Sequence, residues 1–363
     1  MSELKRSLGL FECTVMGVGV ILGAGIYALI GEVAALGGNA VWMSFLGAAV
    51  VAAFTGMSYA ELSSMMPAAG GEYSYARRAF GPLPAFVVTW LLLAGLAIAS
   101  AAVALGFGGY LAVMAPVPKQ VAAIGLVAAS SALLLVGVKQ AAWFAMFCTF
   151  LEVVGLVAVL WVGLPLVGTV DLLELNHGWM GLGSAAALVF FAYIGFEEIV
   201  QLAEETRDPT RSVPRALLLC IAITTVIYVL VAVAAVSVLG WKALGASESP
   251  LAEVLETAMG HKAGAALAVL ALFSTANTVL VLLLSASRLV FGMARDDALP
   301  GVLGRVGGRQ TPWPATLLVA GCAAVVVVGV GDIGKIAQLT NASIFATFFA
   351  MNVAVIVLRF KEP

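Results

Sequence analysis

The sequence predicts an all-α integral membrane protein with ten spanning helices, and three observations support this prediction. Of the 363 residues, 62% are hydrophobic and only 10% are charged, whereas soluble domains average about 25% charged residues. Ten apolar runs each approach or exceed the roughly 20 residues that a helix needs to cross a bilayer. The first and sixth runs carry glycines near their centres, which predicts an interruption in both helices.

The ten runs cover the chain without leaving room for a soluble domain. We expect spans at Leu10–Ile30, Ala40–Met65, Leu83–Met114, Gln120–Val138, Trp143–Val167, Gly181–Ala203, Arg215–Leu239, Lys262–Met293, Pro314–Val330 and Ile336–Leu358. Ten helices can divide as five plus five. We therefore expect a single transmembrane domain over residues 1–363, built as an inverted repeat of about residues 8–168 and 180–358, in which helices one and six correspond.

The lysines and arginines predict how the chain is oriented in the membrane. With the N-terminus in the cytoplasm, fourteen of the 18 basic residues fall in inside segments and four in outside loops, as basic residues favour cytoplasmic loops. The even number of spans then returns the C-terminus to the cytoplasm. We expect a multi-pass protein of the cytoplasmic membrane.

The outside loop after the seventh span predicts a short helix of its own. Ser249 is a suitable N-cap, Pro250 suits the first helical position, and Gly260 suits the stop. We expect this helix either to lie on the lipid headgroups or to act as an external lid.

Helix one contains the segment GVGVILGAGIYALIG, in which four glycines fall between Gly17 and Gly25. Each glycine costs about 1 kcal/mol relative to alanine in a helix interior. The cluster therefore indicates either close helix packing through Gly19 and Gly23 or an unwound segment at Gly23-Ala24-Gly25. Free N–H groups at such a break must face a cavity instead of lipid, and they attract an anion such as a carboxylate.

Helix six contains the segment ALVFFAYIGFEEIV, and we expect its break around Ala192–Gly195. Carbonyl groups released at a break can accept hydrogen bonds from an ammonium group. Together the two breaks predict a site for a zwitterion, with the carboxylate on helix one and the amine mainly on helix six.

Other functional classes have less support. His177 and His261 lie in predicted loops and the four cysteines stand singly, so we expect no metal site, no cofactor and no enzymatic centre. The segment GVGDIGK, Gly329–Lys335, fits GxGxxG but follows a membrane span instead of a strand. No basic stripe predicts a nucleic-acid partner. An ion channel would need rings of like residues and flux that does not saturate.

Five motifs resemble those of the amino acid–polyamine–organocation permeases, in the same order. They are GVGVILGAGIY, PAAGGEYSYARRAFGP (Pro67–Pro82), FFAYIGFEE, EETRDPTRSVPRA and SASRLVFGMARDDALP (Ser285–Pro300), and the resemblance runs from Leu8 to Pro363. It implies the LeuT-type inverted-repeat fold and secondary transport of an amino acid by alternating access, often coupled to protons. Many members have twelve helices, whereas this sequence ends at VLRFKEP, so the resemblance leads us to expect that helices eleven and twelve are absent or truncated. The sequence does not indicate the oligomeric state.

The resemblance also implies roles for particular residues. Ile21, Gly23, Ala24 and Gly25 would hold the substrate carboxylate. Phe190, Phe191, Ala192 and Tyr193, followed by Gly195, would supply carbonyls for the amine and an aromatic gate. Phe191 occupies the position at which some relatives have a gating tryptophan.

Three carboxylates are candidates for coupling transport to protons. Glu152 stands where several proton-coupled relatives have a lysine, about 14 Å into helix five at 1.5 Å per residue, and a carboxyl at that depth can bind and release a proton. Alignment with the family's sixth-helix motif places Glu197 at the position that faces the core. Glu198 is an extra carboxylate next to that position. Each of them can instead tie helices together structurally.

Hydroxyls of helix eight complete the expected coupling site. Ser274 and Thr275, near Asn277, would line the substrate site or a cation position, or bond back to their own helix. We therefore expect proton symport of amino acids or related amines. Exchange of one amino acid or polyamine for another is the alternative, and an ion channel is a more distant one.

Overall fold

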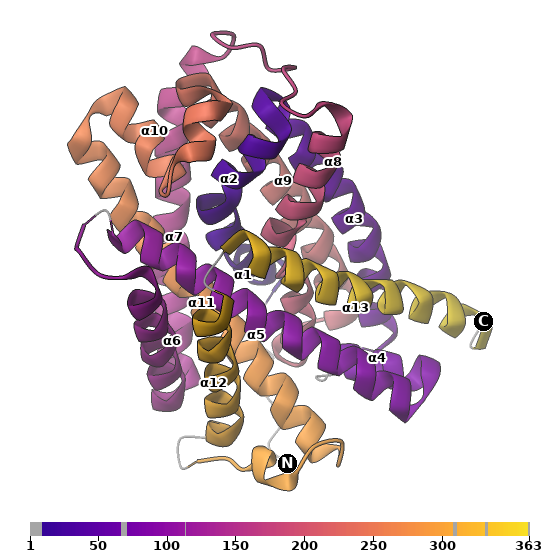
Figure 1. Ribbon diagram of the computed structural model, residues 1–363. Helices are drawn as coiled ribbons and strands as arrows, with labels where there is room; N and C mark the ends of the chain where they lie inside the picture. Colours follow the sequence, from indigo (N-terminus) through magenta and orange to yellow (C-terminus); the bar gives the residue numbers. More distant parts are fainter. Residues whose placement is uncertain (1–8, 67–70, 113, 308–310, 331–332, 362–363) are drawn as a thin grey trace.

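The computed structural model describes residues 9–66, 71–112, 114–307, 311–330 and 333–361, and every regular element in these ranges is a helix. Figure 1 shows the helices as one bundle in which α13 runs beside α5, with α10 at one end. Part of the GVGDIGK segment, residues 331–332, and part of the Pro67–Pro82 motif, residues 67–70, lie outside the described residues.

The α-helices are α1 (Leu10–Leu22), α2 (Ala24–Gly37), α3 (Val41–Met65), α4 (Gly71–Phe80), α5 (Pro82–Ala112), α6 (Lys119–Val136), α7 (Val138–Gly163), α8 (Gly178–Val189), α9 (Pro209–Ala246), α10 (Pro250–Met259), α11 (His261–Arg295), α12 (Trp313–Val330) and α13 (Ile333–Lys361). Five 3₁₀ helices join them: η1 (Gly38–Ala40), η2 (Leu164–Leu166), η3 (Phe190–Tyr193), η4 (Phe196–Glu205) and η5 (Gly301–Gly304).

The predicted spans correspond to helices of this bundle. Among the described residues, nine helical segments are long and apolar enough to cross a membrane, and the predicted ninth run is a shorter apolar helix, Trp313–Gly329. The expected loop helix is α10, which begins at Pro250 and ends against Gly260, as predicted. The protein is thus an all-α membrane protein, and the division into two inverted repeats stays a prediction.

Helices one and six are both broken, as predicted. The first span is divided into α1 and α2 at Gly23, whose ψ of -133° is not helical. This break is narrower than predicted, because Ala24 already belongs to α2. The sixth span consists of α8 and η3, followed by a break and then η4. At the break, Ile194 is extended and Gly195 has a φ of 120°.

Three ion pairs between described residues each join segments that the predicted topology places on the same side of the membrane. Arg77 pairs with Asp296 at 3.6 Å. Arg359 donates two hydrogen bonds to the carboxylate of Glu61. These four residues lie in predicted inside segments. Lys119 pairs with Glu248 at 2.7 Å across two predicted outside loops. The pairs agree with the relative placement of the loops, while the orientation of the termini stays a prediction.

Candidate substrate site between two broken helices

The break in the first span exposes the start of α2. Gly23 is the N-cap residue, and it makes no side-chain cap hydrogen bond. The first four N–H groups of an α-helix have no acceptor within the helix, and the helix dipole places partial positive charge there. The sequence creates this anion-attracting end because a glycine, with no side-chain oxygen, stands at the cap position.

The two breaks lie directly against each other. A methyl group placed on Gly25 would lie 2.4 Å from the Cα atom of Ala192, so only glycine lets these two backbones approach so closely. Gly195 has a φ of 120°, which side chains of L-residues rarely adopt, and it packs against Val20 of α1. The glycines identified in the sequence therefore bring the two broken helices together.

A tyrosine from α9 links the carbonyl groups of both breaks. The hydroxyl of Tyr228 donates to the carbonyl oxygen of Ala192 at 2.9 Å and lies within hydrogen-bonding reach of the carbonyl oxygen of Ile21. Tyr228 is fully buried. Sequence reasoning missed this residue, although a lone tyrosine in the apolar run ITTVIYVLV was a detectable signal.

A small cavity lies between the breaks, α5 and α11. Its volume is about 20 Å³, which is room for roughly one water molecule. The lining residues are uncharged: Val20, Ile21, Gly25, Ala99, Val103, Phe191, Ala192, Ile194, Thr278 and Leu282. Because this space is too small for an amino acid, the structure represents a closed arrangement of the site.

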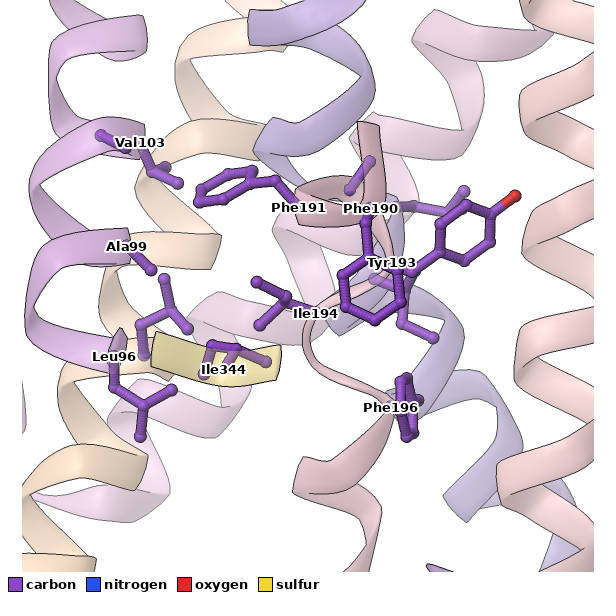
Figure 2. Packing of buried hydrophobic residues seen from close by; sticks show 14 of the residues in the cluster. Leu96, Ala99, Val103, Phe190, Phe191, Tyr193, Ile194, Phe196 and Ile344 are labelled. Atoms are coloured by element: carbon purple, nitrogen blue, oxygen red, sulfur yellow. The ribbon is translucent and has the colours of Figure 1, made fainter. Parts of the chain in front are cut away.

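The structure separates the predicted substrate residues into two groups. Ile21, Gly25, Phe191 and Ala192 line the cavity, and Figure 2 shows Phe191 directed toward Val103 of α5.

The remaining predicted residues lie around the cavity without lining it. Phe190 packs on Phe345 with ring centroids 4.4 Å apart, and Tyr193 donates to the carbonyl of Phe45 at 3.1 Å. Gly23 and Gly195 form the bends. Ala24 begins α2, but its side chain is outside the described part of the structure.

Glu152 is fully buried in α7, behind the first break. One carboxyl oxygen, Oε1, accepts a hydrogen bond from Asn277 Nδ2 of α11 at 3.0 Å, and the other, Oε2, is buried without a partner among the described groups. The carbonyl of Glu152 accepts a bond from Tyr27 of α2 at 2.9 Å. Glu152 therefore connects α7 with α11 and with α2, the second half of the first span, but it does not line the cavity.

Only part of the predicted hydroxyl set faces Glu152. Ser274 stands near its carboxyl without a hydrogen bond of normal geometry. Thr275 instead donates to the carbonyl of Ala271 in its own helix at 2.8 Å, which is the alternative foreseen for a helical hydroxyl. Asn277 makes the contact with Glu152, and its neighbour Thr278 reaches the cavity wall.

The adjacent carboxylates of η4 have different surroundings. Glu197 is 2% exposed, and its Oε2 accepts the N–H of Gly195 at 2.9 Å, so the carboxyl caps the start of η4. Glu198 is partly buried and accepts a hydrogen bond from Ser285 of α11. Among the described residues no group of three or more His, Cys, Asp or Glu side chains could hold a metal ion.

A helical membrane bundle with two facing helix breaks and an enclosed site between them is the architecture of a secondary transporter. The chain belongs to the amino acid permease family, whose family model matches residues 8–363.

Similar proteins differ in the substrate that their names give. The chain is 31% identical to the branched-chain amino acid permease BcaP of Bacillus subtilis (strain 168), over 99% of this chain and 82% of that protein. It is 31% identical to the methylthioribose transporter of the same organism, over 99% of this chain and 83% of that protein. It is 29% identical to the vacuolar cationic amino acid transporter 4 of Arabidopsis thaliana, over 99% of this chain and 64% of that protein.

Proposed function

We propose that this protein is a secondary active transporter that carries amino acids or related amines across the cytoplasmic membrane by alternating access, in symport with protons. The observation that carries the proposal is the contact between the two helix breaks beside an enclosed cavity, at Gly25 and Ala192. Membership of the amino acid permease family supports the same class of substrate.

The backbone at the breaks suits a zwitterion. The uncapped N-terminus of α2 attracts the substrate carboxylate, and the carbonyls of the segment Phe190–Tyr193 accept hydrogen bonds from the amine. The Ile21 and Ala192 carbonyls are held by Tyr228 in the closed arrangement. Substrate binding therefore requires the cavity to widen, which agrees with a cycle of opening and closing.

The cavity wall favours a neutral substrate side chain. All ten lining residues are uncharged, and Val20, Ala99, Val103 and Leu282 are apolar. A cationic side chain would be buried there without a partner, which is costly. We therefore propose aliphatic amino acids as the preferred substrates, in line with the name of the branched-chain relative.

Glu152 is the proposed site of proton coupling. Its carboxyl is fully buried and has one oxygen without a described partner, and a proton there would remove the cost of a buried charge. The Glu152 carboxyl bonds to Asn277 of α11, so a change in its protonation acts directly on that contact. The main-chain carbonyl of Glu152 accepts the Tyr27 hydroxyl of α2, so a shift of α7 at this residue also reaches the first span.

Uptake into proteoliposomes tests the proposal. Labelled leucine, lysine and methylthioribose are offered with and without an inwardly directed proton gradient, and the vesicles are loaded with buffer or with unlabelled leucine. We expect saturable leucine uptake that the gradient stimulates. Uptake that requires internal amino acid would indicate exchange, flux that does not saturate would indicate a channel, and no uptake of any amino acid would contradict the proposal.

A further inference from the structure

Three carboxyl side chains, two on η4 and one on the short helix α4, lie within electrostatic range of one another, away from Glu152. Glu197 and Glu198 belong to η4, and Glu72 is the second residue of α4. Glu72 is 1% exposed and Glu197 is 2% exposed, while Glu198 is partly buried. Sequence analysis did not single out Glu72, because it lies in a connecting segment instead of a span.

The three carboxyls form one electrostatic cluster with Tyr59 of α3. The Glu72 carboxyl lies close enough to repel those of both Glu197 and Glu198. The Tyr59 hydroxyl stands beside Glu72 and within electrostatic range of Glu197, and its ring meets Phe196 edge-on with centroids 5.9 Å apart. Three separate elements, α3, α4 and η4, thus meet at these side chains.

Several buried polar atoms of the cluster have no hydrogen-bond partner among the described groups. Tyr59 Oη, Tyr75 Oη and Glu197 Oε1 are all buried without a hydrogen-bond partner among the described groups, and their residues are at least 98% buried. Buried polar atoms of this kind are costly unless satisfied. A protonated carboxyl can donate as well as accept, so a bound proton gives the buried carboxyls a donor of their own beside the two tyrosine hydroxyls.

The charges around the cluster also favour bound protons. Described groups that also act on the cluster include Tyr59, Tyr75, Cys220 of α9, and Ser285 and Arg288 of α11, and Arg288 is the cation among these five. Neighbouring carboxyls in a buried setting cannot all ionise at low cost. Burial raises the pKa of Glu72 to about 7, so protons are exchanged near neutral pH.

We propose that Glu72, Glu197 and Glu198 form a proton-binding site, separate from Glu152, which holds η4 against α3 and α4 while it is protonated and releases η4 when it is deprotonated. Loss of the proton leaves like charges facing each other between α4 and η4. The hydrogen bond from Ser285 to Glu198 transmits the displacement to α11. Protonation stabilises the state in which η4 is held in place and not the state in which η4 is released. It therefore shifts the population toward the held state.

Infrared difference spectroscopy tests the proton site directly. Purified protein in lipid nanodiscs is titrated from acidic to alkaline pH, and the C=O stretching band of protonated carboxyls is followed. We expect Glu72→Gln and Glu197→Gln each to lose a component that titrates near neutral pH, and Glu152→Gln to retain it. Glu61→Gln is the matched control, since Glu61 pairs with Arg359 outside the cluster. A component unchanged in both Glu72→Gln and Glu197→Gln would overturn the proposal.

Hydrogen–deuterium exchange of residues 196–205 tests the release of η4. After correction for the intrinsic effect of pH on amide exchange, wild-type protein should exchange faster in η4 at alkaline pH. Glu72→Gln, which imitates the protonated residue, should lose this pH dependence, whereas Glu61→Gln should keep it. An η4 segment whose corrected exchange is independent of pH in the wild type would contradict the release mechanism.

This inference adds a second proton site to the proposed function, but its tests do not depend on that function. Both readouts are made on purified protein without substrate or gradient. If uptake proves to be exchange without proton coupling, the carboxyl band and the exchange of η4 still report whether the cluster binds protons.

Discussion

The Tyr228 hydroxyl donates a hydrogen bond to the carbonyl of Ala192 at 2.9 Å. Since the same hydroxyl reaches the Ile21 carbonyl in the other broken helix, one side chain of α9 connects both halves of the site. A hydroxyl has a single proton to donate, so the two carbonyls share it. Any movement that separates the breaks must break this connection.

Tyr228→Phe removes the connection and retains the ring. We expect the free energy of unfolding to fall by about 1–3 kcal/mol, because two carbonyls lose their buried donor, and transport to fall further than stability alone explains. Uptake and thermal unfolding of the same preparation check this. Tyr110→Phe is the matched control, since the Tyr110 hydroxyl also donates to a main-chain carbonyl, that of Tyr27, at 2.6 Å. Equal transport loss in both variants would show that the bridge has no special role.

Gly25→Ala should separate the two broken helices. The new methyl group would lie 2.4 Å from the Ala192 Cα atom, and such overpacking typically costs about 1–3 kcal/mol. We expect loss of leucine binding in a thermal-shift assay together with reduced stability. Gly183→Ala is the control on the other broken helix, because nothing lies within 4 Å of that position, and it should be neutral or slightly stabilising. Normal leucine binding by Gly25→Ala would refute the proposed site.

Glu152→Gln should uncouple transport from the proton gradient. Glutamine retains an oxygen that can accept the hydrogen bond from Asn277, 3.0 Å away in the wild type, but it cannot gain or lose a proton at this position. We expect uptake driven by a leucine gradient to persist and the stimulation by a proton gradient to disappear. Undiminished stimulation in this variant would exclude Glu152 as the coupling residue.

Phe191→Leu should enlarge the cavity and change substrate preference. Phe191 is 6% exposed and forms part of the cavity wall, so a smaller side chain leaves space for a larger substrate. Because a few methylenes in an apolar pocket change specificity by about tenfold or more, we expect phenylalanine to compete more strongly for leucine uptake. Phe349→Leu, at a residue that is 71% exposed, should leave the competition profile as in the wild type.

Glu72→Gln should stabilise the protein at neutral and alkaline pH. Below pH 4.5 the residue is protonated in both folded and unfolded chains. As the pH rises to about 7, the unfolded chain loses the proton while burial retains it in the folded protein, so wild-type stability falls over this window and is constant above it.

At about 1.4 kcal/mol for each pKa unit, the rise of the Glu72 pKa from 4.5 to about 7 corresponds to about 3 kcal/mol. Thermal unfolding at several pH values should therefore show the variant above the wild type at alkaline pH, with the difference closing toward pH 4.5. Described groups that interact with Glu72 include Tyr59, Tyr75, Glu197 and Glu198. A constant difference at all pH values would mean that Glu72 does not titrate in this window.

The sequence by itself determined the features that depend on neighbouring residues along the chain. Apolar runs of spanning length predicted the helices of the bundle, since each span satisfies its own backbone within lipid. Glycine placement predicted the breaks at Gly23 and Gly195, and Pro250 and Gly260 predicted the ends of α10. Local backbone preferences are sufficient for these features.

Only the tertiary structure decided which side chains meet. Phe191 lines the cavity while its neighbour Phe190 packs away from it. Asn277 instead of Thr275 reaches Glu152. Tyr228 lies in an apolar run and Glu72 in the Pro67–Pro82 motif, but nothing along the chain indicated which groups either side chain would meet. The physical reason is that helix rotation and packing bring together residues far apart in the chain, and one residue's step along a helix turns a side chain by about 100° to other neighbours.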